Sequence, residues 1–313
     1  MSNAIARTGQ EAAGPAHSGP CIDQVQDHGI IDCAACGYRH VLPLPEADEE
    51  IAGAANASFA PPAGEDLAWM ALGDGDRLAL LEGTLRRPRR EGGFRLLDVG
   101  AGGGHFARAA RERGFLVTAV EPSREAAGHA RGFGLNVLEA PFSAETARGL
   151  GRFEAVHMMN VLEHVPNPRE LLALAYDLLL PGGAICVGVR NDYNAFQLAA
   201  ARLQELPHWW VTPPRRLNFL DFSSLARLLV RSGFSLGERF TSFPMELFLL
   251  FGERHMARAA WTRAPHRKRK VLDLALEAAH EAPVRRAFYN ALAEAGLGHD
   301  AILFAVKPHS GGE

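Results

Sequence analysis

A group of glycines near residue 100 is the first feature of this chain that could do chemistry. The apolar run 94–99 leads directly into Gly100, Gly102 and Gly104. Glycines at a strand-to-helix turn adopt backbone angles that other residues avoid and let a ligand approach the main chain closely. The helix that follows points its free N–H groups at that ligand. The pattern therefore predicts a ligand-binding loop.

Two carboxylates accompany this loop. Asp98 stands just before the glycines, and Glu121 ends the next apolar run. A carboxylate at the position of Glu121 can accept hydrogen bonds from both ribose hydroxyls of an adenosine group. The charge of Asp98 can face the ammonium of S-adenosylmethionine, whereas it would repel a pyrophosphate. The spacing Gly102-x-Gly104-x-x-Ala107 also fits a dinucleotide fingerprint, but no second glycine-rich half follows, so the residues favour S-adenosylmethionine over NAD.

The elements that must position this loop alternate between strands and helices from residue 94 onward. Such alternation implies parallel strands with helices on both faces of the sheet. The predicted fold class is α/β, a Rossmann-like doubly wound sheet of seven mainly parallel strands, in which ligands bind beyond the carboxyl ends of the strands. Strands are expected within 94–100, 115–122, 135–140, 153–165, 184–189, 234–243 and 300–308, and helices within 74–87, 105–114, 123–134, 168–183 and 223–233.

The stretch 95–190 resembles class I S-adenosylmethionine-dependent methyltransferases, of the broad group that includes the ubiquinone-pathway O-methyltransferases. LLDVGAGGGHFARAARERGFLVTAVEPS is similar to their first motif and acidic strand end, and VHMMNVLEHVPNPRELLALAYDLLLPGGAICVGV is similar to their fourth strand, the loop and helix after it, and their fifth strand. The resemblance implies methyl transfer by direct displacement to a small-molecule acceptor, such as a sugar or a natural-product intermediate.

The resemblance also implies which residues bind the cofactor. Relatives carry an acidic residue near the end of the third strand that contacts the adenine amine, whereas this chain reads Glu139-Ala140-Pro141-Phe142, so its adenine contacts are less well defined. The implied contacts are Asp98, Gly100, Gly102, Gly104, Glu121, Pro122, Ser123, Pro141, Phe142, Asn160 and Leu162.

Three side chains are candidates for a general base, which is needed only if the acceptor must lose a proton. His164 follows the fourth strand, Tyr193 follows the fifth, and His208 precedes a pair of tryptophans. Each has a structural alternative: a loop histidine bonded to backbone, a polar loop residue, or an aromatic packing residue. We expect the acceptor pocket between the loop after the fifth strand, the segment 208–216 and the helical region 245–298.

The cysteines near the start of the chain form half of a zinc-binding pattern. Cys33 and Cys36 have the spacing of two thiolates on one tetrahedral metal. Cys21 is a candidate third ligand, and His17, His28 and His40 compete for the fourth position. A complete site usually shows two such pairs, and only one is present, so zinc is possible but not favoured and we predict a metal-free segment held against the main domain by residues 41–45.

The whole chain has an ordinary globular composition, with 313 residues and a formal charge of −3. We expect a disordered tail at 1–19, the cysteine-bearing segment at 20–45, a linker with a helix at 46–93, and a catalytic domain at 94–313 whose region 245–298 is a helical insertion. The balance of charges gives no pull toward nucleic acid, and the basic run 263–270 is expected to be a solvated helix face.

No apolar stretch is long enough to span a bilayer, so we predict a cytoplasmic protein. We expect it to act on a small molecule. Residues 245–298 are a candidate interface for a homodimer. Two other functions stay open: a non-catalytic binding or zinc-ribbon scaffold module, and an NAD-dependent enzyme.

Overall fold

A seven-stranded sheet forms the centre of the computed structural model, which describes residues 17–45, 59–88, 91–253 and 258–309, with backbone alone for 258–265. Its strands are β4 (Arg95–Val99), β5 (Leu116–Val120), β6 (Asn136–Leu138), β7 (Phe153–Met159), β8 (Leu179–Arg190), β10 (Ser235–Phe240) and β11 (Asp300–Val306). Their order is β10-β11-β8-β7-β4-β5-β6. The strands from β8 to β6 are parallel, and β11 is antiparallel to both of its neighbours. The predicted Rossmann-like sheet is therefore confirmed.

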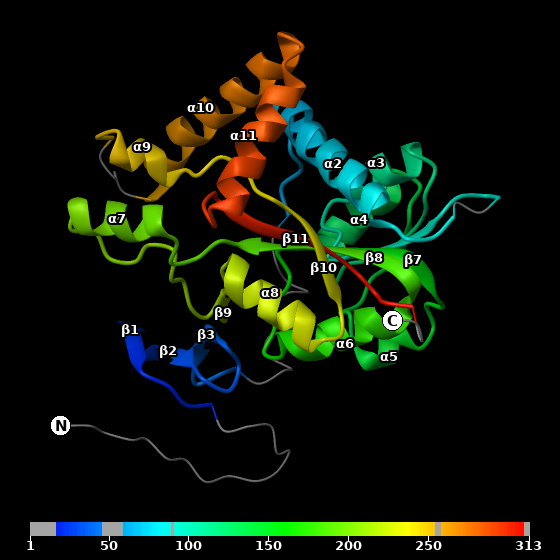
Figure 1. Cartoon of the computed structure of the whole chain (residues 1–313), viewed down its shortest axis with the longest axis horizontal. Helices are drawn as coiled ribbons and strands as arrows, with labels where there is room; N and C mark the ends of the chain where they lie inside the picture. Colours follow the sequence, from blue (N-terminus) through cyan, green and yellow to red (C-terminus); the bar gives the residue numbers. More distant parts are fainter. Residues whose placement is uncertain (1–16, 46–58, 89–90, 254–257, 310–313) are drawn as a thin grey trace.

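Helices cover both faces of this sheet (Figure 1). They are α2 (Glu65–Thr84), α3 (His105–Glu112), α4 (Arg124–Gly132), α5 (Ala144–Ala147), α6 (Pro168–Leu178), α7 (Ala195–Leu203), α8 (Phe222–Arg231), α9 (Glu246–Leu250), α10 (Arg258–Ala278) and α11 (Ala282–Glu294). In Figure 1, α5, α6 and α8 lie on one face, whereas α2, α3 and α11 lie on the other. The connections between parallel strands are thus helical crossovers, as the alternating pattern predicts.

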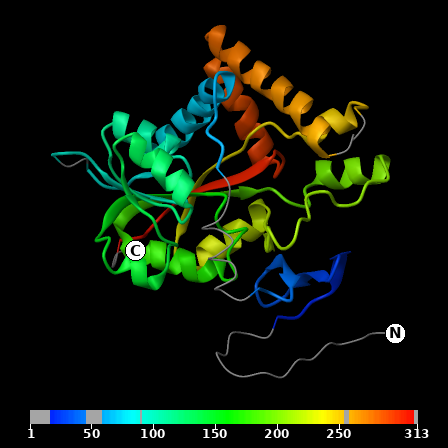
Figure 2. The same cartoon turned by 180° about the vertical axis from the view of Figure 1, so that it is seen from behind.

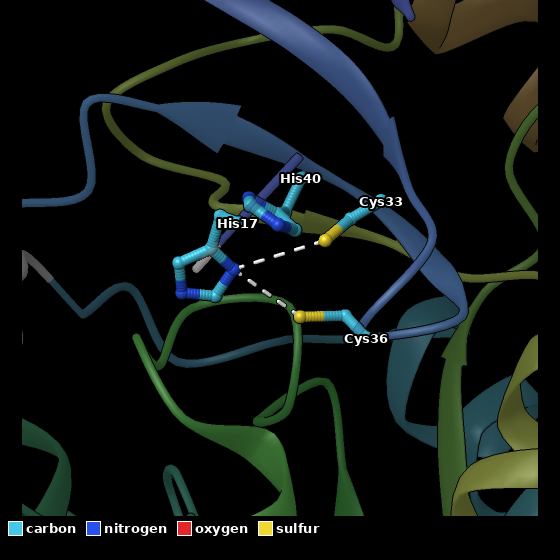
Figure 3. Close-up of side chains that lie close together, drawn as sticks. All are labelled: His17, Cys33, Cys36 and His40. Carbon is cyan, nitrogen blue, oxygen red and sulfur yellow. Dashed lines mark hydrogen bonds between the residues drawn. The ribbon is translucent and has the colours of Figure 1, made fainter. Parts of the chain in front are cut away.

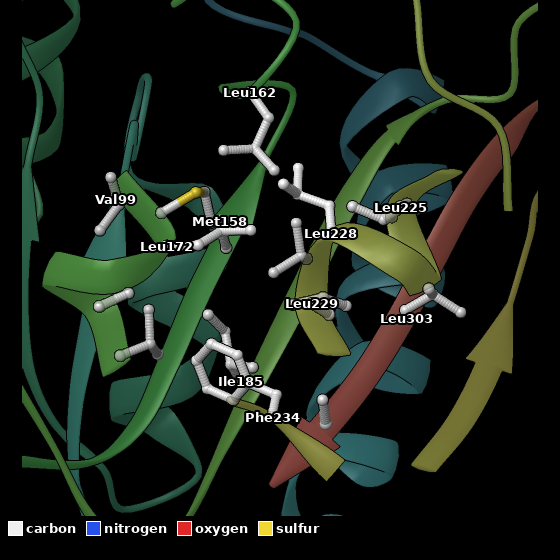
Figure 4. Close-up of a cluster of buried hydrophobic side chains, with 14 of the residues drawn as sticks. Val99, Met158, Leu162, Leu172, Ile185, Leu225, Leu228, Leu229, Phe234 and Leu303 are labelled. Carbon is white, nitrogen blue, oxygen red and sulfur yellow. The ribbon is translucent and has the colours of Figure 1, made fainter. Parts of the chain in front are cut away.

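The face under α6 and α8 holds a large apolar core (Figure 4). Leu172 from α6 and Leu225 from α8 are fully buried against Ile185 of the sheet. Burying each such side chain stabilises the fold by about 1.5–3 kcal/mol. Local signals agree with this packing, because the side chain of Asn167 accepts a hydrogen bond from the Glu170 amide at the start of α6. The core therefore holds α6 and α8 against the sheet.

The opposite face carries buried charges beside its apolar residues. Leu78 and Leu81 of α2 are buried there. The guanidinium of Arg285 on α11 donates to Asp76 on α2 over 2.7 Å, and the two side chains are 4% and 2% exposed. Arg286 donates to the same carboxylate, but its own side chain is 54% exposed. An ion pair inside the protein thus holds α11 against α2.

A second, smaller sheet lies beside α8 and away from α2 and α11 in both views (Figures 1 and 2). It consists of β1 (Cys21–Val25), β2 (His28–Cys33), β3 (Tyr38–Leu42) and β9 (Asn218–Phe219), all antiparallel. Ile30 and Val41 are fully buried in a cluster with Trp210, Leu217 and Phe219. The cysteine-bearing segment is therefore joined to the large domain by strand pairing as well as by apolar contact.

One predicted boundary differs from the structure. The helix expected from residue 74 starts at Glu65, because tertiary contacts hold its first turns: Trp69 donates from Nε1 to Asp273 on α10 over 2.7 Å. After β8 the chain forms α7, whose start Asn194 caps through its side chain. The side chain of Asp221 caps the start of α8.

Two expectations about the whole chain meet the structure only in part. Most of the predicted tail, residues 1–16, and much of the predicted linker, residues 46–58, lie outside the described residues. None of the helices in the described part combines the length and the apolarity that crossing a membrane requires.

The buried ion pair of α11 gives a prediction about stability. Replacing Arg285 by Met leaves Asp76 buried without its main partner, so we expect the free energy of unfolding to fall by about 3–5 kcal/mol. Arg286→Met is the matched control, because its exposed side chain contributes at most about 1 kcal/mol. Urea unfolding of both variants measures the difference, and equal losses would show that the two arginines are interchangeable.

Candidate functional site

The glycine loop between β4 and α3 is shaped by three residues with positive φ. These are Gly100 at 69°, Gly102 at 53° and Gly104 at 80°. A Cβ on Gly100 would lie 2.5 Å from Val161, and one on Gly104 would lie 2.6 Å from Ala130. A Cβ on Gly102 would meet no atom within 4 Å. Two of the glycines therefore serve close packing, and Gly102 borders open space in which a ligand can lie.

The carboxylate of Glu121 folds over this loop. One oxygen accepts a hydrogen bond from the Gly102 amide over 2.8 Å, and the other accepts one from the Ser123 amide over 2.9 Å. Burial raises the pKa of Glu121, while these two amide hydrogen bonds act in the opposite direction. Each carboxylate oxygen has a second acceptor position. Glu121 can therefore hold the loop and still accept hydrogen bonds from a pair of ligand hydroxyls.

Asp98 lies beneath the loop and is 1% exposed. Its Oδ1 accepts a hydrogen bond from Nδ1 of His157 over 2.7 Å. Burial lowers the pKa of His157, while the carboxylate of Asp98 acts in the opposite direction. The second oxygen of Asp98 is buried and has no hydrogen-bond partner among the described residues. An unsatisfied buried acceptor costs free energy, and a donor on a bound ligand would offset that cost.

The other predicted cofactor residues differ in how far they are exposed to solvent. Pro122 and Pro141 are partly exposed, and Ser123 and Phe142 are buried. Asn160 is exposed at the carboxyl end of β7, with a φ of 54°. Leu162 is fully buried in the core, and its carbonyl accepts a hydrogen bond from Asn218. The contact of Leu162 with a cofactor, which the resemblance implies, stays a prediction.

Phe59 is a site residue that sequence reasoning missed. A Cβ on Gly103 would lie 2.3 Å from its ring, so the aromatic side chain covers the glycine loop. Its amide donates to Glu125 over 3.1 Å, and its ring centroid lies 5.1 Å from that of His129. The only signal in the sequence is an aromatic residue within an Ala- and Pro-rich linker.

A cavity of about 350 Å³ opens beyond the carboxyl ends of β7 and β8. Its volume lies in the range of pockets for small molecules. Asn160 and Arg190 stand at the two strand ends, and α2, β10, β11, α10 and α11 supply most of the remaining walls. Residues that line it include Trp69, Asp74, Arg77, Arg269, Asp273, Arg285, Tyr289 and Asp300. The predicted helical region thus forms part of the wall, but the segment 208–216 does not line the cavity.

Most charges in the cavity wall are paired within the protein. Arg190 donates to Asp300 over 3.2 Å, Arg77 pairs with Asp74, and Arg285 pairs with Asp76. Burial raises the pKa of Asp300, whereas the neighbouring His299 lowers it. The net effect is a pKa of Asp300 below its usual range. The wall is therefore polar and largely self-neutralised.

Arg269 is the exception among these charges. Its guanidinium lies over the ring of Trp69 at 4.6 Å, and its Nε donates to His266 over 2.8 Å. Its Nη1 is buried without a hydrogen-bond partner in the described part of the chain, where Arg269 forms no salt bridge either. Burial lowers its pKa. Arg269 and Lys270 are buried, whereas Arg267 and Lys268 are exposed, so the basic run is only partly the expected solvated face.

The three candidate bases do not line this cavity. His164 donates from Nδ1 to the carbonyl of Arg215 over 2.6 Å, which ties it to the backbone. Tyr193 and His208 pack together with ring centroids 5.5 Å apart, and Nδ1 of His208 donates to Asp23 of β1 over 2.7 Å. Their catalytic roles stay predictions, and the contacts that the structure shows for them are with the backbone and the small sheet.

Comparisons with known proteins show the family to which this chain is similar. Residues 71–238 match the model of a protein family that is described as a methyltransferase domain. The ubiquinone biosynthesis O-methyltransferase of Caulobacter sp. (strain K31) is 38% identical over 155 residues, which are 45% of this chain and 61% of that protein. The enzyme of the same name from Xanthomonas oryzae pv. oryzae (strain PXO99A) is 34% identical over 143 residues, or 44% of this chain and 59% of that protein. The match thus spans less than two thirds of each relative.

Solved structures with a similar fold include a putative sarcosine dimethylglycine methyltransferase from Galdieria sulphuraria. It covers 78% of this chain and 87% of its own at 15% identity, with a TM-score of 0.46.

The different surroundings of the glycines give a prediction. Alanine at either Gly102 or Gly104 forces a side chain into left-handed backbone, which costs about 1–2 kcal/mol. Only Gly104→Ala adds an overlap with Ala130, and overpacking costs about 1–3 kcal/mol more. Differential scanning calorimetry should show the larger loss of stability for Gly104→Ala. Equal losses would contradict the close packing of α3 against α4 at this position.

Proposed function

This chain belongs to the methyltransferase domain family, because residues 71–238, more than half of its length, match the model of that family. We propose that it transfers a methyl group from S-adenosylmethionine to a small-molecule acceptor. The observation that carries the proposal is the Glu121 carboxylate, which folds over the glycine loop beside the open space at Gly102. Bound there, S-adenosylmethionine supplies an electrophilic methyl group on its sulfonium.

The residues around the loop fit such a cofactor. Glu121 offers free acceptor positions for ribose hydroxyls. The unpartnered oxygen of Asp98 is a buried anionic acceptor that suits a cationic amino group and disfavours a pyrophosphate. This argues against NAD, whose two phosphates would add negative charge near Asp98. Phe59 would cover the ligand and limit its contact with water.

The acceptor site is proposed to be the cavity beyond β7 and β8. Asn160 stands at the end of β7 next to the glycine loop and also lines the cavity, so it adjoins both binding spaces. A direct displacement requires that donor and acceptor are aligned and that water is excluded. The enclosing helices α2, α10 and α11 would provide that exclusion.

The charges of the cavity suggest the chemical class of the acceptor. Arg269 is buried with an unsatisfied Nη1, so a carboxylate or phosphate on the acceptor would pair with it. The names of the relatives describe O-methyltransferases, which supports a hydroxyl as the methylated group. We therefore propose a small hydroxylated acceptor that carries an acidic group.

Self-association through residues 245–298 also stays a prediction. Val284 and Phe288 of α11 and Val271 of α10 are exposed apolar side chains that would form such a contact.

The cofactor assignment predicts the effect of removing Glu121. Glu121→Ala should weaken the binding of S-adenosylhomocysteine by about 1.5–3 kcal/mol, the range for hydrogen bonds to a charged group. Glu139→Ala is the control, because Glu139 follows the neighbouring strand but is exposed and paired with Arg131. Isothermal calorimetry measures both affinities. Binding of NAD without binding of S-adenosylhomocysteine would show that the assignment is wrong.

The acceptor class is tested with two probes that differ in one group, protocatechuate and catechol. Protocatechuate carries a carboxylate, and catechol is the same ring without it. Arg269→Met should raise the KM for protocatechuate at least about tenfold and leave that for catechol nearly unchanged. Arg267→Met on the same helix is exposed and serves as the control. Methylation of catechol in preference to protocatechuate by the natural protein would contradict the proposed acidic group.

A further inference from the structure

The small sheet brings four metal-binding side chains together (Figure 3). They are His17, Cys33, Cys36 and His40, and their ligand atoms all lie within 4.8 Å of one another. Cys33 ends β2, Cys36 lies in the turn after it, His40 lies on β3, and His17 comes from the segment before β1. We propose that these four residues bind one Zn²⁺ ion, which holds the small sheet together. This proposal replaces the prediction of a metal-free segment that the sequence favoured. It does not depend on the methyltransferase assignment.

The distances from His17 to the two cysteines fit a tetrahedral site. Nδ1 of His17 lies 3.3 Å from Sγ of Cys36 and 3.8 Å from Sγ of Cys33. Zinc–sulfur bonds are about 2.3 Å and zinc–nitrogen bonds about 2.0–2.1 Å, so ligand atoms at neighbouring corners of a tetrahedron are about 3.3–3.8 Å apart. Thiolates and imidazoles are also the ligands that structural zinc sites use.

His40 provides an independent sign of a missing ligand. It is 1% exposed. Its Nδ1 donates a hydrogen bond to the carbonyl of Val41 over 2.9 Å, which leaves the lone pair on Nε2. That Nε2 is buried and has no hydrogen-bond partner in the described part of the chain. A histidine that donates one ring N–H to a carbonyl and keeps the other nitrogen free has the arrangement typical of metal ligands.

Backbone contacts build the site from separate segments. The Gly37 amide donates to the carbonyl of Cys33 over 2.8 Å, and a φ of 77° at Gly37 closes the turn. The Ala34 amide donates to the carbonyl of Ser18 over 3.0 Å, so the segment that carries His17 lies along the end of β2. The cluster therefore belongs to the fold of the small sheet and is not a chance encounter of surface side chains.

The other candidate ligands lie elsewhere. Cys21 is exposed, and its Sγ donates to the carbonyl of Asp23. His28 lies at the opposite end of β2 from Cys33. Neither belongs to the cluster. Both are suitable controls, because they are the same residue types in the same sheet.

The site is of the structural kind. Four protein ligands complete a tetrahedron and leave no position for substrate. The segment 17–45 is too short to build a stable core of its own, so a metal would supply what apolar burial cannot. From His40 the sheet continues to β9, where Asn218 donates to the carbonyls of Leu162 and Val165 in the loop after β7. The metal would thereby support the loop that borders the proposed cofactor site.

Metal analysis of the full chain tests the proposal. Protein purified under reducing conditions without chelator should contain one zinc ion per chain by elemental analysis. Exchange with Co²⁺ should give the visible absorption bands of tetrahedral thiolate coordination. Cys33→Ser and His40→Ala should lose the zinc and the bands, whereas Cys21→Ser and His28→Ala should keep both.

A measurement on the unsubstituted chain tests the proposal even if the variants fail to fold. Iodoacetamide should modify Cys21 at once, but modify Cys36 only after a chelator has removed the metal, as peptide mass mapping would show. Metal-free protein that takes up no Zn²⁺ or Co²⁺ would overturn the proposal. So would a Cys33–Cys36 disulfide under reducing conditions, alkylation of Cys36 unaffected by chelator, or full zinc content in folded Cys33→Ser.

Discussion

The hydrogen bond from the Gly102 amide to the Glu121 carboxylate joins the ends of two adjacent parallel strands. Val99 lies beside Val120 in the register of β4 and β5, so the glycine loop and Glu121 leave the sheet at the same level. The missing Cβ at Gly100 then lets Val161, in the loop after β7, pack directly against the first loop. Three segments far apart in the sequence thus meet at one edge of the sheet. The open space at Gly102 exists because these contacts hold the surrounding backbone in place.

Beyond that edge, the wall of the cavity combines ion pairs and hydrogen bonds with apolar side chains such as Phe240 and Ile302. Asp76 with Arg285, Asp300 with Arg190, and Asp273 with Trp69 each join helices or strands that enclose the cavity. Buried ions are costly unless they are paired, so such walls are tolerated only where each group finds a partner. Arg269 contacts Trp69 and His266 but has no ion-pair partner in the described part of the chain, and the proposal of an acidic acceptor rests on this feature.

Local patterns in the sequence predicted the central sheet, the glycine loop and Glu121, because strand period, turn glycines and a strand-end carboxylate are properties of neighbouring residues. What could not be predicted depends on contacts between distant segments. Phe59 contacts Gly103 and Glu125, which lie far from it in the sequence. His40 lies beside the two cysteines because β3 pairs with β2, and His17 because the segment before β1 lies along the end of β2. The contact of His208 with Asp23 of β1, and of Tyr193 with His208, also depends on how the small sheet lies against the large domain, and their catalytic roles stay predictions.

The pairing of β3 with β9 has a consequence for how the chain assembles during synthesis. Strand β9 lies at residues 218–219, so β3 leaves the ribosome long before its outer neighbour exists. The hairpin of β2 and β3 is local, and closing it requires only a short loop. All four clustered side chains are present once residue 40 has emerged. The hairpin of β2 and β3 can therefore pair early, but its Ile30 and Val41 are buried only after Trp210, Leu217 and Phe219 have been made.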